Sequence, residues 1–177
     1  MKRMIPSLVA SLAVTLLVVP QVRAAQGGQA SAGQAAAFER LKSLDGEWTG
    51  EASHGGDKMP VTVRYHVTAD GSAVFETLFA GTPHEMVTVY TMDRGRLVLT
   101  HYCAAHNQPR MRARDDSGAD RISFDFDGGA NIDPKKDNHM HEAALAFADG
   151  DHLHAEWTSW DKGKPAGKAV LDLARAK

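Results

Sequence analysis

Turn signals recur at short, even intervals through most of this chain, and that spacing constrains the fold more than any other feature. Between the turns, apolar and polar residues alternate, as in residues 61–68, which is the pattern of a half-buried strand. The turn signals are Asp70-Gly71, Gly81-Thr82-Pro83, Asp93-Arg94-Gly95, Ser117-Gly118, Gly128-Gly129, Asp149-Gly150 and Lys162-Gly163. Short strands joined by close turns predict an antiparallel sandwich or barrel.

A single helix is expected before the strands. Ser31-Ala32-Gly33-Gln34 fits a capping box, and apolar residues recur at helical spacing from Ala37 to Leu44, so a helix is predicted over about 33–43. The ten strands that follow are predicted over residues 47–53, 59–68, 73–80, 84–92, 96–104, 110–115, 120–127, 138–148, 152–160 and 167–174. The predicted fold class is therefore all-β: an antiparallel up-and-down β-barrel of about ten strands, with the short N-terminal helix closing one end.

The first 24 residues have the composition of a secretory signal peptide. Lys2 and Arg3 precede an uncharged apolar run from Ser7 to Val19, and Val22-Arg23-Ala24 is a small-x-small cleavage signature. The run is shorter than the ~20 apolar residues of a membrane-spanning helix, although an N-terminal anchor stays the alternative. We therefore expect an exported protein, periplasmic or secreted, with no membrane span after cleavage.

The charge balance argues against polyanionic partners. Removal of residues 1–24 would take Lys2, Arg3, Arg23 and no acid, leaving 17 of the 20 basic side chains against 22 acidic ones. Nucleic acids and anionic membranes both require clustered positive charge, so neither is expected as a partner. Residues 25–32 are small and polar and are expected to be disordered, which leaves one barrel domain over residues 33–177.

Hairpin geometry predicts which side chains face the barrel interior. A three-residue turn at Asp93–Gly95 pairs Met92 with Arg96, and pairing Ala80 with His84 orients the preceding hairpin. The side chains that these two hairpins turn inward are Phe75, Thr77, Phe79, Glu85, Val87, Val89, Leu97, Leu99, His101 and Cys103.

The hairpin over residues 138–160 is expected to close with a three-residue loop. That loop aligns Phe147 with Leu153 and Ala143 with Trp157, so that His141 falls inward opposite Ser159.

Polar side chains are expected to gather at the barrel end opposite the helix. Alternate turns of an up-and-down meander share one end, so the long loops 54–58, 81–83, 104–109, 128–137 and 161–166 lie together. The ligand-binding residues predicted there are Glu85, His101, Cys103, Asn107, Gln108, Arg110, His141 and Trp157. Two of these have an alternative: Arg110 belongs either to an anion anchor or to an exposed polar strand face, and Cys103 is either a packed side chain or a free thiol.

Two histidines have a spacing that β-barrel metal sites use. His139 and His141 are two residues apart, which places both imidazoles on one face of a strand. A metal site requires a third ligand, which would have to come from His101, Cys103, His106 or Glu85. For His101 the alternative is a core histidine satisfied by one hydrogen bond.

Several motifs together resemble known barrels. A short helix running into Leu41-x-x-Leu44-x-Gly46-x-Trp48-x-Gly50, followed by a β-meander, resembles the lipocalin-like (calycin-type) and nitrobindin-like folds. Further motifs resemble a group of uncharacterised exported bacterial proteins with that fold: Gly46-Glu47-Trp48-Thr49-Gly50, Thr100-His101-Tyr102-Cys103, Asn107-Gln108-Pro109-Arg110-Met111 and Asn138-His139-Met140-His141. The resemblance implies the fold and not a task, because such barrels host many functions.

Three functions are compatible with these features, and a fourth, catalysis, is not favoured by them. The first is a binding module that holds a small apolar or amphipathic molecule in the barrel interior. The second is a haem or metal barrel using His101 or His141, although the nitrobindin-like proximal histidine near the C-terminus has no counterpart after His154. The third is a structural domain with a filled core. Catalysis is disfavoured, because neither a G-x-S-x-G motif nor a phosphate loop is present.

Overall fold

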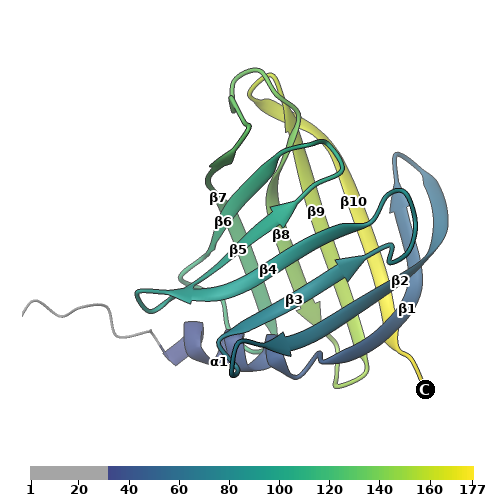
Figure 1. The fold of residues 1–177 in the computed structure, drawn as a ribbon, viewed down its shortest axis with the longest axis vertical. Coiled ribbons are helices and arrows are strands. Elements are labelled where there is room, and N and C mark those ends of the chain that lie inside the picture. The colour runs from purple at the N-terminus through teal and green to yellow at the C-terminus, as the bar shows by residue number, and fades with distance from the viewer. Residues whose placement is uncertain (1–31) are drawn as a thin grey trace, which may run out of the picture.

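Ten antiparallel strands close into a barrel in the computed structural model, which describes residues 32–177 (Figure 1). The elements are α1 (Ala32–Lys42), β1 (Gly46–His54), β2 (Asp57–Thr68), β3 (Ala73–Leu78), β4 (Met86–Asp93), β5 (Arg96–Tyr102), β6 (Gln108–Ala113), β7 (Arg121–Ala130), β8 (His139–Phe147), β9 (His152–Asp161) and β10 (Lys164–Arg175). Each strand pairs with the next, and β1 pairs with β10, so the sheet has no free edge.

The predicted fold class is confirmed. The signal peptide predicted over 1–24 and residues 25–31 of the predicted disordered segment lie outside the described residues, whereas residue 32 is the first residue of α1. Within residues 32–177, no helix has the length and apolar character needed to cross a lipid bilayer.

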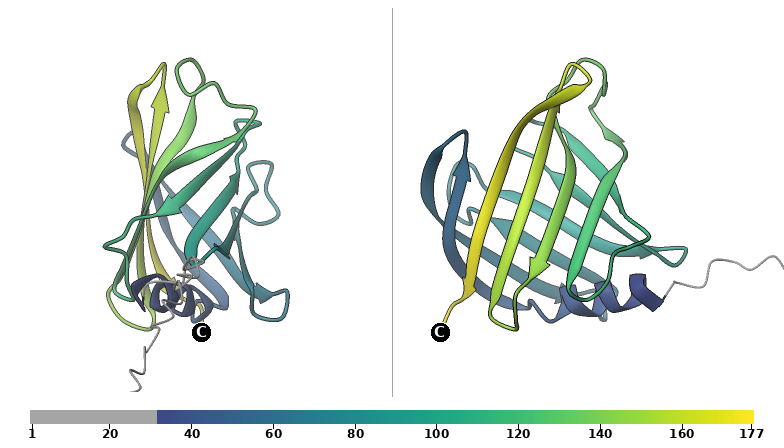
Figure 2. Two further views of the ribbon diagram at one scale, coloured as in Figure 1. Left: turned by 90° about the vertical axis from the view of Figure 1, so that its left-hand side faces the viewer. Right: turned by 180° about the vertical axis from the view of Figure 1, so that it is seen from behind.

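Helix α1 closes one end of the barrel, as Figures 1 and 2 show. Its buried face consists of Gln34, Ala37, Phe38 and Leu41. The Gln34 side chain accepts a hydrogen bond from the Leu97 backbone N–H (2.9 Å) and donates one to the Arg114 carbonyl (2.8 Å). The helix is therefore attached by hydrogen bonds to β5 and to the segment after β6, as well as by apolar packing.

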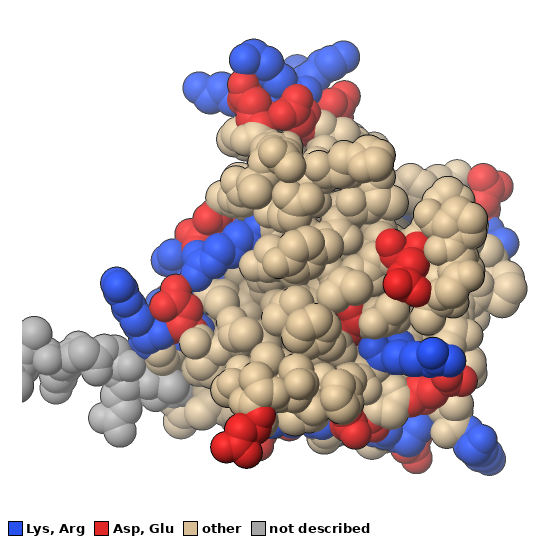
Figure 3. All heavy atoms as spheres, viewed as in Figure 1, with Lys and Arg blue, Asp and Glu red and all other residues tan. Residues whose placement is uncertain are grey.

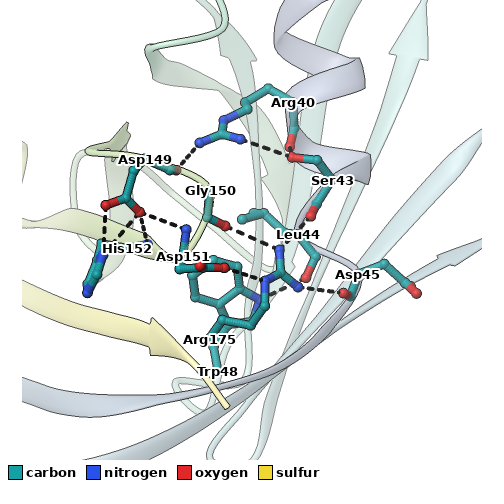
Figure 4. A network of polar contacts seen from close by, with 10 residues as sticks. All are labelled: Arg40, Ser43, Leu44, Asp45, Trp48, Asp149, Gly150, Asp151, His152 and Arg175. Carbon is teal, nitrogen blue, oxygen red and sulfur yellow. Dashed lines mark hydrogen bonds and ion pairs between the residues drawn. The ribbon is translucent and has the colours of Figure 1, made fainter. Parts of the chain in front are cut away.

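Arg175, the last residue of β10, joins three segments at this closed end (Figure 4). Its guanidinium donates to the carbonyls of Ser43 (2.8 Å) and Asp45 (2.9 Å) and pairs with Asp151 (3.2 Å). The same guanidinium lies over the Trp48 ring, 4.5 Å from its centroid. The C-terminal strand is thereby connected to the end of α1 and to the β8–β9 turn.

The β4–β5 hairpin differs from the prediction by one residue. Arg94 (φ 49°) and Gly95 (φ 82°) form a two-residue turn with both residues at positive φ, so Asp93 and not Met92 pairs with Arg96. A one-residue slip exchanges the faces of a strand. The prediction that Val87 and Val89 point inward is therefore wrong; the inward side chains of β4 are Met86, Thr88, Tyr90 and Met92.

Strand β3 is reversed in the same way. Phe75, expected inside, is 40% exposed, whereas its neighbour Glu76 is only 2% exposed. Thr77, also expected inside, shares the outward face with Phe75 and pairs with Val87. As a result the outer surface of β3 and β4 is largely uncharged, which Figure 3 shows as a broad area without Lys, Arg, Asp or Glu. The sequence prediction failed here because both faces of these strands are rich in apolar or aromatic residues.

The β8–β9 hairpin matches its prediction up to a bulge. Phe147 pairs with Leu153 and Ala143 with Trp157, as expected. The register then shifts between Met140 and Glu142, so Met140 pairs with Ser159. The prediction that His141 lies opposite Ser159 is wrong, because the bulge takes up His141 as the extra residue.

Replacing Arg175 tests how the barrel end is held. We expect Arg175→Ala to lower the free energy of unfolding by about 1–3 kcal/mol, because carbonyls of the α1–β1 connection lose charged hydrogen-bond donors. Arg112→Ala is the matched control: Arg112 pairs with Asp127 (2.8 Å) on the outer surface and its loss should cost less than about 1 kcal/mol. Urea unfolding of both variants measures the difference, and equal losses would contradict this role of Arg175.

Candidate functional site

A cavity of about 270 Å³ lies at the barrel end opposite α1. Its position follows from β1, which starts beside the helix at Gly46 and reaches the cavity at its other end with Ala52, Ser53 and His54. The residues that line it are Ala52, Ser53, His54, Met59, Leu78, Phe79, Met86, His101, Met140, Trp157, Ala169 and Leu171. The lining is thus mostly apolar, and it includes three methionines together with Phe79 and Trp157.

The strand ends bring these residues together from distant parts of the sequence. Met86 begins β4, His101 is the last inward residue of β5, and Trp157 lies on the inward face of β9. Met140 reaches the cavity because of the bulge in β8, and Met59, which is 47% exposed, leaves one side of the cavity lining accessible to solvent. Methionine side chains adapt to ligands of irregular shape, since they are unbranched and polarizable.

His101 is the buried polar group of the cavity lining. It is 2% exposed, and its Nδ1 lies 3.0 Å from the Thr88 hydroxyl. Its ring packs on Trp157 with the centroids 4.9 Å apart. Burial lowers the pKa of His101 from 6.5 to about 4, because the low-dielectric interior disfavours the charged imidazolium. At neutral pH the cavity therefore presents a neutral imidazole.

A buried carboxylate stands behind this histidine. Glu76 on β3 accepts hydrogen bonds from the hydroxyls of Tyr65 and Tyr90, each at 2.8 Å. Burial raises the pKa of Glu76, while hydrogen bonds from Tyr90, Tyr65 and Thr88 act in the opposite direction. Thr88 is paired with Glu76 across β3 and β4 and its hydroxyl contacts His101, so that Tyr65, Glu76, Thr88, Tyr90 and His101 form one polar cluster in the barrel wall.

Of the eight predicted ligand-binding residues, the structure brings His101 and Trp157 to the cavity. Glu85, expected to point inward, is exposed and accepts a hydrogen bond from the Gly81 backbone N–H (2.6 Å), because the register of β4 differs from the prediction. Cys103 is half-buried in the β5–β6 loop, where its backbone N–H donates to the Asn107 carbonyl (3.1 Å). It is not a lining residue of the cavity.

Three further predicted residues belong to the loop and strand surfaces beside the cavity. Asn107 is buried and donates from its side chain to the Asn138 carbonyl (2.8 Å), and Gln108 accepts from the Asn131 amide (3.2 Å). Arg110 pairs with Asp93 (2.7 Å) and with Asp127. Arg110 is therefore engaged in ion pairs on the outer face of the sheet. This agrees with the predicted alternative in which Arg110 belongs to an exposed polar strand face.

His139 and His141 form an aromatic stack outside the cavity lining. His141 lies between Trp160 (ring centroids 3.8 Å apart) and Phe126 (4.8 Å), and its Nδ1 is 3.0 Å from His139 Nε2. Burial, and next the proximity of His139, lower the pKa of His141. The predicted metal set His139, His141 and His101 is not assembled: residues 32–177 contain no group of three or more His, Cys, Asp or Glu side chains placed to hold a metal ion.

The sequence prediction missed Glu76, Thr88 and Tyr90, the polar residues behind His101. They alternate with apolar residues on strands whose two faces look alike in sequence. The signal that identifies them is the two-residue turn at Arg94-Gly95, since it sets the register of β4 and hence of β3.

The comparisons with known proteins support the fold alone. No protein-family model matches the chain, and no curated protein matches it in sequence. Among solved structures, the chain is similar to Rv2717c from M. tuberculosis (TM-score 0.54, 16% identity), over 80% of this chain and 98% of that one. It is also similar to a DUF3598-family protein of unknown function from Nostoc punctiforme PCC 73102 (TM-score 0.54, 11% identity), over 77% of this chain. The match spans 49% of the length of the Nostoc protein.

The lowered pKa of His101 predicts a pH-dependent stability. The unfolded chain binds a proton at this residue near pH 6.5 and the folded chain only near pH 4, so stability falls as the pH decreases between these values. The loss is on the order of 3 kcal/mol. Urea unfolding of the wild type and of His101→Phe at pH 7 and pH 4.5 measures it: the wild type should lose more stability than the variant. Parallel losses in the two proteins would contradict a buried neutral His101.

Proposed function

We propose that this protein binds one small apolar or amphipathic molecule in the cavity at the open end of its barrel. The observation that carries the proposal is the cavity itself, about 270 Å³ in volume, apolar in lining, with the buried imidazole of His101 as its fixed polar group. Small-molecule sites are typically apolar concavities with few polar groups, of roughly 300–1,000 Å³. The volume is near the lower limit of that range, which favours a compact ligand such as a single substituted ring.

The cavity favours this function over a purely structural barrel. A domain whose only role is structural is expected to fill its interior with side chains, as cores normally do. Here side chains from β1, β8, β9 and β10 line a cavity and do not fill it. Met59, which also lines the cavity, is half exposed. The helix and Arg175 close the other barrel end, so that a ligand enters from one side.

Export of the protein belongs to the same proposal. The basic start, the apolar run from Ser7 to Val19 and the Val22-Arg23-Ala24 signature support it, as does the resemblance to exported lipocalin-like barrels. A binding barrel outside the cytoplasm is suited to collecting or buffering a small molecule. Haem and metal binding stay predictions of the sequence, and no described contact favours them.

Filling the cavity tests the proposed function. Ala169 on β10 lines the cavity, and Ala169→Phe should reduce the affinity for a small aromatic probe such as toluene by about tenfold or more, because the added ring occupies the ligand volume. Ala146→Phe is the matched control, since Ala146 lies on β8 outside the cavity lining and should leave the affinity unchanged. Calorimetric or NMR titration gives the affinities.

Two results would contradict the proposal. One is the absence of binding by the wild-type protein to toluene and to a panel of compounds of similar size. The other is an equal effect of Ala169→Phe and Ala146→Phe on the affinity, with both variants folded by circular dichroism.

A further inference from the structure

The buried polar cluster determines what His101 can offer to a ligand. The residues that line the cavity include three polar ones, Ser53, His54 and His101, and of these only His101 is buried. Its hydrogen-bonding capacity depends on the tautomer of the ring, because a neutral imidazole has one N–H donor and one acceptor nitrogen. The contacts behind the ring assign these two roles.

The first step concerns the carboxylate. Both oxygens of Glu76 accept a hydrogen bond from a tyrosine hydroxyl, which is the pattern of an ionised carboxylate, a group with only acceptor oxygens. Tyr65 donates to Oε1 and Tyr90 to Oε2, each at 2.8 Å, and Thr88 is the residue paired directly with Glu76 across β3 and β4, so its hydroxyl lies on the same inward face. No Lys, Arg or His side chain is hydrogen-bonded to Glu76 among residues 32–177, so hydroxyl groups provide the compensation that a buried carboxylate requires.

The second step passes through Thr88. A hydroxyl has a single proton. We assign the Thr88 proton to the paired Glu76, because a carboxylate is a stronger hydrogen-bond acceptor than a neutral imidazole nitrogen. The contact of 3.0 Å between Thr88 Oγ1 and His101 Nδ1 is then made with the threonine oxygen as acceptor. The proton of the neutral imidazole consequently lies on Nδ1, and Nε2 carries the lone pair.

The third step places Nε2 in open space. Within residues 32–177, the hydrogen bond at Nδ1 is the only one made by the His101 ring. The fully buried side-chain nitrogen and oxygen atoms without a partner in that range are Asn107 Oδ1 and Trp160 Nε1. Because His101 Nε2 lacks a partner and is not one of these fully buried atoms, it reaches open space, and the cavity is the space that His101 lines.

We propose that the Glu76 cluster holds His101 as the Nδ1–H tautomer, with the Nε2 lone pair facing the cavity. This inference rests on the proposed function and defines the ligand class: a compact apolar molecule that carries a hydrogen-bond donor, of which phenols and alcohols are the simplest. A ligand of similar shape that has only acceptors, such as an ether or a ketone, leaves Nε2 buried and unpaired, and this costs affinity.

The tautomer can be measured without any ligand. Nitrogen-15 NMR of the histidine rings distinguishes a protonated from an unprotonated ring nitrogen. At pH 7 we expect a protonated Nδ1 and an unprotonated Nε2 for His101. In Thr88→Val the acceptor for the Nδ1 proton is lost, so the tautomer population of His101 should shift toward Nε2–H. Thr77→Val, on the outward face of β3, should leave the tautomer population unchanged. A protonated Nε2 in the wild type would overturn the inference.

The ligand class is tested with phenol and fluorobenzene, which have similar size but differ in the donor. We expect the ratio of their dissociation constants to shift by about five- to tenfold against phenol in His101→Phe, because the variant has a ring without an acceptor nitrogen. Thr88→Val, which keeps the imidazole, provides a second variant should His101→Phe fail to fold. It should shift the ratio in the same direction, and Thr77→Val should not shift it.

The outcomes separate this inference from the proposed function. If both probes bind the wild type, and the ratio of their dissociation constants in His101→Phe and Thr88→Val is the same as in the wild type, the donor requirement is wrong. The cavity then remains a binding site. If neither probe binds the wild type, the proposed function fails and the inference fails with it.

Discussion

The burial of one carboxylate inside the barrel wall is the constraint on which much of this structure depends. Glu76 is 2% exposed, and a buried charge is strongly destabilising unless its oxygens are hydrogen-bonded. The hydroxyls around it come from neighbouring strands: Tyr65 on β2 and Tyr90 on β4 donate to it, and Thr88 on β4 is paired with it. All of them must point inward for the carboxylate to be satisfied, so a slip of one residue in β4 would break the cluster and expose its members. The apolar residues of β2, β3 and β4 do not specify the register of these strands. The polar cluster does.

The same cluster connects the barrel wall to the cavity. Thr88 contacts Glu76 on one side and His101 on the other, and His101 packs on Trp157 at the open end. The opposite end is closed by a helix whose Gln34 bonds to β5 and by Arg175, which holds the segment between α1 and β1. The two ends therefore differ in kind: one is fixed by hydrogen bonds to backbone groups, and the other leaves a largely apolar space with the buried imidazole of His101.

The sequence predicts the barrel well because turns and the helix start are local signals. Strand number, helix position and the pairing of Ala143 with Trp157 follow from such signals. Which faces of β3 and β4 point inward does not follow from such signals. An Arg-Gly turn is an unusual two-residue hairpin loop, and the residues on the two faces are similarly apolar. The bulge at His141 is equally invisible in the sequence. The cavity lies at the barrel end where the sequence predicts the polar residues to gather, but of the predicted residues only His101 and Trp157 line it, and the sequence does not predict the role of Glu76.

Methyl NMR of the methionines tests the central claim most directly, because the chain places these probes both in the cavity and away from it. Met59, Met86 and Met140 line the cavity, whereas Met92 and Met111 do not. With phenol added to protein carrying ¹³C-labelled methionine methyls, ring-current shifts should appear at the three cavity methyls and leave Met92 and Met111 nearly unchanged. Unchanged cavity methyls, or shifts of similar size at all five residues, would contradict a binding site at the open end of the barrel.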